Sequence, residues 1–272
     1  MILTCWEGAY RIIGWRPWLF PAPSHVLDAT LEMVGVQTAF GDPLSSHWPR
    51  MPVDEGAPVE KTPSVFQSPL ITAIASSLAR LIVGFAAALL LGAILGMSMW
   101  RWPAFDRFLG PLLLGLQTLP SVCWIPVAIL LLGINERGVL FVLVMGTFSA
   151  VALSLRDGLS AIPPLYPRAG LMLGASGWRL YRYVLLPASL PALAGSLRTG
   201  FSFAWRSLMG AEMIFALEKW GGLGFLLENG KDFNDIAQVV AIMIVMVCVG
   251  MLADRCVFAV VQRKVQKRFG LA

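Results

Sequence analysis

The sequence predicts an all-α protein that crosses a membrane several times, and three observations carry this prediction. First, 57% of its 272 residues are hydrophobic and only 14% are charged, whereas soluble domains carry about 25% charged residues. Second, residues 70–99 hold a single charge, Arg80, and residues 236–253 hold none, and about 20 apolar residues suffice for one crossing. Third, the basic residues gather in short connections between the apolar segments, as membrane topology requires.

Five spanning helices are expected, each bounded by charges, glycine or proline. The first is longer than a bilayer needs, so it should tilt or protrude. The second is interrupted by Pro111, Pro120 and Pro126, and such breaks are tolerated where a segment is buried in protein or lines a cavity. The expected spans are 70–99, 109–132, 138–155, 193–217 and 236–261.

The distribution of Lys and Arg sets the orientation of these spans. The connections 100–108 and 156–192 and the tail after residue 261 are rich in basic residues, whereas 133–137 and 218–235 are not. The first three are therefore expected in the cytoplasm, which places the C-terminus inside and residue 69 outside. No basic stripe with interleaved aromatic residues occurs, so no nucleic-acid partner is expected.

Residues 1–69 are interpreted as a separate extracytoplasmic or interfacial segment. Residues 40–69 are rich in proline and acidic residues, and residues 26–36 repeat apolar side chains at helical spacing, which predicts a short amphipathic helix. Residues 1–19 contain a glutamate and two arginines, so they form a poor crossing and lack the apolar core of a signal peptide. Three alternatives stay open: the N-terminus lies outside, a weak first span lies here, or a span precedes this chain.

The most informative segment is the long cytoplasmic connection over residues 168–187. Its first part is predicted to be a helix that breaks at Gly-Ala-Ser-Gly, residues 174–177, and Pro187 should begin the next element. The intervening amphipathic helix has Trp178, Tyr181 and Leu185 on one side, and Arg179 and Arg182 on the other. Such a helix–turn–helix suits the groove of a partner protein. The alternative is an interfacial helix that lies on lipid.

The spacing of this segment places Gly174 five residues after Ala169, and Val184 ten further on, before Leu-Pro. It resembles the EAA loop of permease subunits of bacterial ATP-binding-cassette (ABC) importers, which reads E-A-A, three residues, G, nine residues, I, one residue, L-P. Arg168 replaces the Glu, Gly170 the second Ala and Val184 the Ile. The resemblance implies coupling helices that dock into an ATPase subunit, with Gly174 allowing the turn. The implied coupling residues are Arg168, Ala169, Gly170, Gly174, Ala175, Val184, Leu186 and Pro187.

Further segments narrow the resemblance to the permeases of sulfonate, taurine, nitrate and bicarbonate importers, over about residues 15–265. These segments are Leu-Pro-Ser-Val-Cys-Trp-Ile-Pro at 119–126, Leu-Gly-Ile-Asn-Glu at 132–136, Ala-Trp-Arg at 204–206, Ala-Glu-Met at 211–213, Gly-Leu-Gly-Phe-Leu at 222–226 and Phe-Pro-Ala-Pro-Ser at 20–24. The family normally has a sixth spanning helix before the Phe-Pro segment, and this chain offers only a weak candidate for it.

The resemblance implies the transmembrane fold of a type I ABC importer over residues 70–265, followed by a cytoplasmic tail over 266–272. It implies a homodimer in the bacterial inner membrane, in contact with lipid, that joins two ATPase subunits and an extracytoplasmic solute-binding protein. ATP and Mg²⁺ would be bound by the partner ATPase, in keeping with the lack of a G-x-x-x-x-G-K-[ST] motif here. Neither a Ser-His-Asp constellation nor a metal-binding Cys or His spacing is present, so no enzyme, metal or cofactor of its own is expected.

Polar side chains within the spans are candidates for the translocation path. Gln117, Ser121 and Trp124 are spaced by four and three residues and would share one helical face, which suits either a cavity lining or helix packing. A charge in mid-span is costly, so Arg206 is expected either to meet a passing oxyanion or to form a structural pair with a carboxylate such as Glu212. Arg80 could be structural or reach toward the outer surface.

The function implied by the resemblance is ATP-driven import of a small oxyanion such as a sulfonate, taurine, nitrate or bicarbonate. The alternative from another class is an ion-coupled secondary transporter of small solutes. Intramembrane acids or inverted repeats would favour that alternative, and the sequence shows neither.

Overall fold

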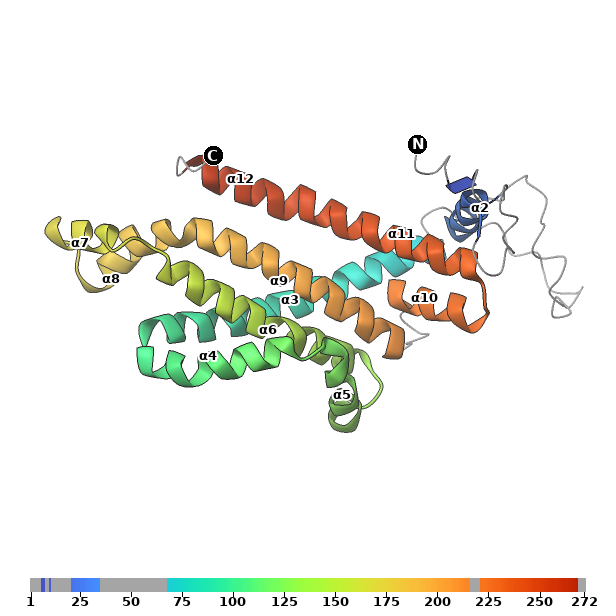
Figure 1. Ribbon diagram of the computed structural model, residues 1–272, viewed down its shortest axis with the longest axis horizontal. Helices are drawn as coiled ribbons and strands as arrows, with labels where there is room; N and C mark the ends of the chain where they lie inside the picture. Colours follow the sequence, from blue (N-terminus) through green and yellow to red (C-terminus); the bar gives the residue numbers. More distant parts are fainter. Residues whose placement is uncertain (1–5, 8–9, 11–20, 35–67, 216–220, 269–272) are drawn as a thin grey trace, which may run out of the picture. The chain divides into compact units, whose positions relative to one another are not determined.

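The structure is a computed structural model that describes residues 6–7, 10, 21–34, 68–215 and 221–268. Within these ranges every regular element is helical (Figure 1). The described residues divide into two compact units, one within 1–77 and 218–246 and the other within 78–217 and 247–272. Residues 40–67 of the expected proline-rich segment over 40–69, and most of residues 1–19, lie outside the described residues.

The first unit contains α2 (Pro23–Val34), the beginning of α3 (Pro69–Arg101), α10 (Leu223–Asp232) and the first part of α11 (Ile236–Ala253). The short amphipathic helix predicted over 26–36 corresponds to α2. Two serines of α3 hold the start of α10: Ser76 Oγ donates to the carbonyl of Gly221 at 2.5 Å, and the Leu223 amide donates to Ser77 Oγ at 2.9 Å. α10 ends in a tight turn at Asn234, whose φ is +57°, a conformation that asparagine tolerates better than most residues.

The second unit is a bundle of long helices built around α6. It contains most of α3, then α4 (Pro103–Thr118), the 3₁₀ turn η3 (Ser121–Trp124), α5 (Ile125–Leu132), α6 (Glu136–Ser160), α7 (Leu165–Met172), α8 (Gly177–Leu180), the π-helical turn η4 (Tyr181–Leu185), α9 (Leu186–Phe215), the π-helical turn η6 (Asp254–Phe258) and α12 (Ala259–Arg268). Figure 1 shows α6 and α9 running side by side, with α7 and α8 in the connection at one end of this pair.

α6 is the core helix of the second unit, and a glycine on its neighbour α3 lets these two helices approach closely. Val139, Val142, Leu143 and Ala152 on α6 are fully buried. A Cβ added at Gly96 of α3 would lie 2.6 Å from the carbonyl oxygen of Ala152, so any side chain there would push α3 away. Close backbone approach through glycine is the usual way that membrane helices pack, since no hydrophobic driving force acts between them in lipid.

α9 is fixed to the C-terminal helix by a paired charge. Arg198 donates from Nε and Nη2 to the two carboxylate oxygens of Asp254, both at 2.8 Å, and from Nη1 to Gln262 at 3.3 Å. A two-point contact between guanidinium and carboxylate fixes direction as well as distance. α9 follows the 168–187 loop directly, so the pair connects that loop to α12.

The predicted second span is strongly bent. α4 begins at Pro103 and ends at Thr118, and the following η3 and α5 turn away from it by 100°. Leu119 has extended backbone angles and precedes Pro120, and a residue before proline is disfavoured in helical conformation. The break predicted from the prolines is therefore present at Pro120, whereas Pro111 lies inside α4.

Three described helices are long and apolar enough to cross a membrane: Pro69–Arg101, Glu136–Ser160 and Ile236–Val265. The bent pair Pro103–Thr118 and Ser121–Leu132 would add a fourth crossing. α9, the predicted fourth span, has the necessary length of 30 residues but lies outside this group. The count of five spans therefore stays a prediction.

Candidate coupling loop and transport path

The loop over residues 168–187 is a compact helix–turn–helix, and Gly174 makes its turn. The Ala175 amide donates to the carbonyl of Gly170 at 2.9 Å, and the Gly174 amide donates to that of Leu171 at 3.0 Å. This pair of bonds is a Schellman motif, which needs a left-handed residue after the helix end. Gly174 supplies it with φ of +82°. A Cβ there would meet nothing within 4 Å, so the backbone angle, rather than space, favours glycine.

The two arms of the loop pack against each other at Gly170. A Cβ added at this position would lie 2.7 Å from Leu180 Cδ1 and 3.0 Å from Val184 Cγ2. Gly170 and Val184, which are two positions of the sequence motif, thus lie next to each other in the fold. Pro187 is the second residue of α9, close to where the next element was expected to begin. The side chains of Trp178, Tyr181 and Leu186 lie outside the described part of the loop.

The tip of the loop presents apolar side chains outward. Met172 is 89% exposed and Leu173 is 88% exposed, directly before the Gly174 turn. Leu171 and Tyr183 are also exposed, as is Arg168 at the position where the motif has Glu. Contiguous apolar groups at an exposed tip mark an interaction site rather than a solvated turn.

The structure separates the three side chains that were predicted to share one helical face. That prediction assumed a continuous helix through residues 117–124, and the break at Leu119 and Pro120 removes it. Gln117 lines a cavity beside α4. Ser121 instead packs over Gly146 of α6, and Trp124 lies edge-on to Phe141 of α6 at 6.3 Å between ring centroids.

Arg80 is a buried charge of the bundle, and it contacts two glutamates on different helices. Arg80 is 7% exposed; its Nη1 lies 2.9 Å from Glu212 Oε1 on α9, and its Nη2 lies 3.3 Å from Glu136 Oε1 on α6. The Glu212 side chain is 1% exposed. The sequence signal for this cluster was present, because all three are charges at or within apolar segments, but no spacing rule connects α3, α6 and α9.

The proposed Arg206–Glu212 pair is therefore wrong within one chain, because Glu212 contacts Arg80. Arg206 instead donates from Nε to the carbonyl of Ser202 at 3.2 Å and lies 4.8 Å from the centroid of the Phe203 ring. It is exposed in the single chain. An exposed guanidinium on a helix of the bundle is available to a ligand or to a second copy.

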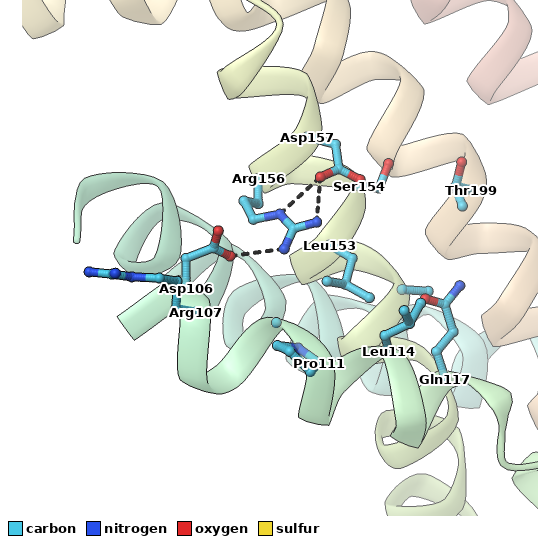
Figure 2. Close-up of a pocket in the computed structure, with 12 residues that line it drawn as sticks. Asp106, Arg107, Pro111, Leu114, Gln117, Leu153, Ser154, Arg156, Asp157 and Thr199 are labelled. Atoms are coloured by element: carbon cyan, nitrogen blue, oxygen red, sulfur yellow. Dashed lines mark hydrogen bonds and ion pairs between the residues drawn. The ribbon is translucent and has the colours of Figure 1, made fainter. Parts of the chain in front are cut away.

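A cavity of about 710 Å³ lies between α4, α6 and α9 (Figure 2). Its volume falls in the range of small-molecule sites, roughly 300–1,000 Å³. One end is charged and the other mixes apolar groups with one amide. The lining residues are Asp106, Arg107, Gly110, Pro111, Leu114, Gln117, Ala150, Leu153, Ser154, Arg156, Asp157 and Thr199.

Arg156 holds both carboxylates of the charged end. Its Nη1 donates to Asp106 at 2.8 Å, and its Nε and Nη2 donate to Asp157 at 2.9 and 2.6 Å (Figure 2). The sequence placed these residues in cytoplasmic connections, whereas the structure includes them in α4 and α6. The ion pair with Asp106 therefore joins the end of α6 to the start of α4.

Comparison with known families decides the identity of the chain. Residues 88–267 match the family described as the binding-protein-dependent transport system inner membrane component. The chain belongs to that family. It is thus a permease subunit of an ABC importer and an inner-membrane component, as the resemblance of the 168–187 loop implied; its relatives are permease subunits rather than enzymes.

Three relatives of this permease are named for the transport of taurine, nitrate and bicarbonate. It is 26% identical to the taurine transport system permease protein TauC of Escherichia coli (strain K12) over 254 residues, which is 93% of this chain and 82% of TauC. It is 28% identical to the nitrate import permease protein NrtB of Synechocystis sp. over 67% of this chain and 65% of NrtB. For the bicarbonate transport system permease protein CmpB of the same organism the identity is 25%, over 66% and 64%. The chain therefore spans just under two thirds of NrtB and CmpB.

The fold of this permease is also found in solved structures. A chain of the inward-facing MetNI methionine ABC transporter superposes with a TM-score of 0.59 at 19% identity, over 72% of this permease and 95% of that chain. A second crystal form of MetNI gives a TM-score of 0.61. The predicted class, an all-α type I ABC importer transmembrane fold, is confirmed.

Proposed function

We propose that this permease forms the translocation path for a small oxyanion, of the sulfonate, taurine, nitrate or bicarbonate kind, and that ATP hydrolysis in a partner subunit drives import. The names of its relatives TauC, NrtB and CmpB support the solute class. ATP and Mg²⁺ are bound by the partner ATPase in this proposal, and the chain itself performs no bond chemistry.

The observation that carries the proposal is the exposed apolar tip of the 168–187 loop. Met172 and Leu173 project from a turn that is fixed by two backbone hydrogen bonds. The loop is joined to α6 on one side and to α9 on the other, which are the two helices with the most extensive mutual packing in the bundle. In this proposal a displacement of the loop by an ATPase acts on both helices of this packed pair.

The assembly in this proposal is a homodimer of the permease with two ATPase subunits and an extracytoplasmic solute-binding protein, embedded in lipid with the C-terminus in the cytoplasm. Closure of the ATPases on ATP moves the two loops together. The bundles then tilt and open the central path outward, toward the binding protein. This alternation follows from rigid-body motion of packed helices, which is a common route of switching in proteins.

Co-purification tests the docking step. The permease is expressed together with its genomic neighbours, and binding of an ATPase is measured. The double variant Met172→Asp, Leu173→Asp is compared with Val261→Asp, which places a charge on an exposed apolar residue of a different helix, α12. The loop variant should lose most of the bound ATPase, because two carboxylates would have to be desolvated in the contact. Val261→Asp should retain it. Equal ATPase recovery from both variants would contradict docking through this tip.

The energy source is tested in liposomes that contain the assembled complex. Uptake of taurine, nitrate or bicarbonate should require ATP and the binding protein and should not respond to a dissipated ion gradient. Uptake driven by an ion gradient without ATP would favour the secondary-transporter alternative instead.

A further inference from the structure

The last described helix ends in a cluster of exposed positive charges. Arg263, Lys264 and Lys267 of α12 are all exposed, and no Asp or Glu follows Asp254 in the sequence. Asp254 itself accepts two hydrogen bonds from Arg198 of α9, both at 2.8 Å. Within the part of the chain that the structure describes, none of the three basic side chains of α12 forms an ion pair. Their positive charge is therefore not neutralised inside the bundle.

Exposed apolar side chains precede the basic cluster on the outward side of the same helix. Val257, Val260 and Val261 are exposed. Val260, Lys264 and Lys267 follow one another in α12 at spacings of four and three residues, so they share one face. An outward face that changes from apolar to basic toward the helix end is typical of a helix that passes from the hydrocarbon of a bilayer into its headgroups.

The length of this helix places the basic cluster at the depth of the headgroups. The helix extends over Ile236–Val265, which is 30 residues and about 45 Å at 1.5 Å per residue. The hydrocarbon layer is about 30 Å thick, and the headgroup layers bring the total to about 40–45 Å. A helix that enters the hydrocarbon at Ile236 therefore leaves it after about 20 residues, and tilt moves this point further toward the C-terminus. Arg255 lies near the boundary, where a long basic side chain reaches the headgroups.

We propose that the outward face of α12, with Arg263, Lys264 and Lys267, binds the headgroups of anionic phospholipids. The charges are complementary, and juxtamembrane basic clusters are attracted to anionic lipid surfaces. Arg198 of α9 also donates to Gln262 of α12 at 3.3 Å, so this contact would set the depth of α9 in the membrane as well. The inference needs only the membrane location of the family and is independent of the transported solute.

A fluorophore on Cys256 reports the lipid next to this face. Cys256 is a free, exposed cysteine, and the other three cysteines of the chain are replaced by serine. The permease, expressed with its genomic neighbours, is reconstituted in nanodiscs that contain phosphatidylglycerol or phosphatidylcholine with a nitroxide near the top of one acyl chain. Phosphatidylglycerol should quench the fluorophore about fivefold more effectively, because one basic side chain near the surface already gives this enrichment. Salt at 1 M should remove most of the preference, since it shortens the Debye length to about 3 Å.

Two triple variants separate charge from side-chain identity. Arg263→Gln, Lys264→Gln, Lys267→Gln should bring the quenching by the two lipids close to equal. Arg263→Lys, Lys264→Arg, Lys267→Arg keeps every charge and should keep the preference for phosphatidylglycerol. Loss of the preference in both triple variants would contradict attraction by charge.

A matched control removes three exposed basic residues elsewhere in the second unit. Arg101→Gln, Arg107→Gln, Arg168→Gln changes the net charge by the same amount, and at Cys256 it should keep more than half of the preference for phosphatidylglycerol. An equal loss in this control and in the α12 variant would show that net charge, and not the face of α12, attracts the lipid.

Two further results would overturn the proposal. Equal quenching by the two lipids in the wild type would show that the face has no preference for anionic lipid. Loss of the co-purified ATPase in the neutral α12 variant, with the quenching ratio unchanged, would assign the basic cluster to the ATPase instead. The melting temperature of the neutral variant in detergent should stay close to that of the wild type, because these three side chains are exposed.

Discussion

Arg80 is a charge inside an apolar helix that is stabilised by residues far away in the sequence. Glu212 and Glu136 approach it from α9 and α6, and Glu212 is almost completely buried. A buried ion pair does not by itself stabilise a protein, but the loss of one partner leaves the other charge uncompensated, at a cost of about 3–5 kcal/mol. The cluster therefore holds three helices in one arrangement.

The same substitution at two arginines measures this cost. Arg80→Gln should lower the melting temperature of the detergent-solubilised permease strongly, because Glu212 loses its buried partner. Arg206→Gln should leave it nearly unchanged, since Arg206 is exposed and contacts only its own helix in the single chain. Glu212→Gln added to Arg80→Gln should recover part of the loss. Similar melting temperatures for the two single variants would contradict the structural role of Arg80.

Gly174 is the residue on which the turn of the coupling loop depends. Its φ of +82° costs an ordinary side chain roughly 1–2 kcal/mol, and no neighbouring atom lies near enough to clash. Gly174→Asn should therefore keep ATPase co-purification and uptake, because asparagine adopts this conformation, whereas Gly174→Val should lose both. Equal behaviour of the two variants would show that the backbone angle is not what the loop requires.

At the scale of elements, the close approach of α3 to α6 depends on glycine. A Cβ at Gly96 would lie 2.6 Å from the Ala152 carbonyl oxygen, whereas a Cβ at Gly115 of α4 would meet nothing within 4 Å. Gly96→Ala should thus destabilise the bundle by about 1–3 kcal/mol, and Gly115→Ala should be neutral or stabilising by up to about 1 kcal/mol through helix propensity. Thermal unfolding of the two variants in one detergent checks the difference.

At the scale of the whole molecule, the segment between Phe233 and Lys264 is expected to cross the membrane once, so that these two positions lie on opposite sides of it. Residues 236–253 are 18 residues without a charge and with Gln238 as the one amide side chain, so one crossing is expected to separate the two positions. In a background without cysteine, Phe233→Cys should react with a membrane-impermeant maleimide in intact spheroplasts. Lys264→Cys should react only after permeabilisation. Labelling of both positions in intact cells would contradict the crossing, and the reversed pattern would contradict a cytoplasmic C-terminus.

The class of this protein, the approximate positions of its long helices and the turn within the 168–187 loop could be predicted from the sequence. These features depend on local chemistry: apolar length predicts a crossing, Pro120 breaks a helix, and Gly174 permits a left-handed turn. The extents of α3 and α6 follow the predicted spans within a few residues at most ends. The family could be identified from the loop motif because its glycine and proline positions are separated by fixed numbers of residues.

Which side chains meet depends on the packing of the helices against one another. Glu212 pairs with Arg80 across a separation of 132 residues, whereas the sequence offered Glu212 as a carboxylate partner for Arg206. The chain bends by 100° between α4 and η3, so Gln117, Ser121 and Trp124 do not share one helical face. A helical periodicity holds only while the helix continues. The cavity is lined by residues of three helices, α4, α6 and α9. Contacts between helices depend on packing direction and rotation, which the spacing of residues within any one helix does not contain.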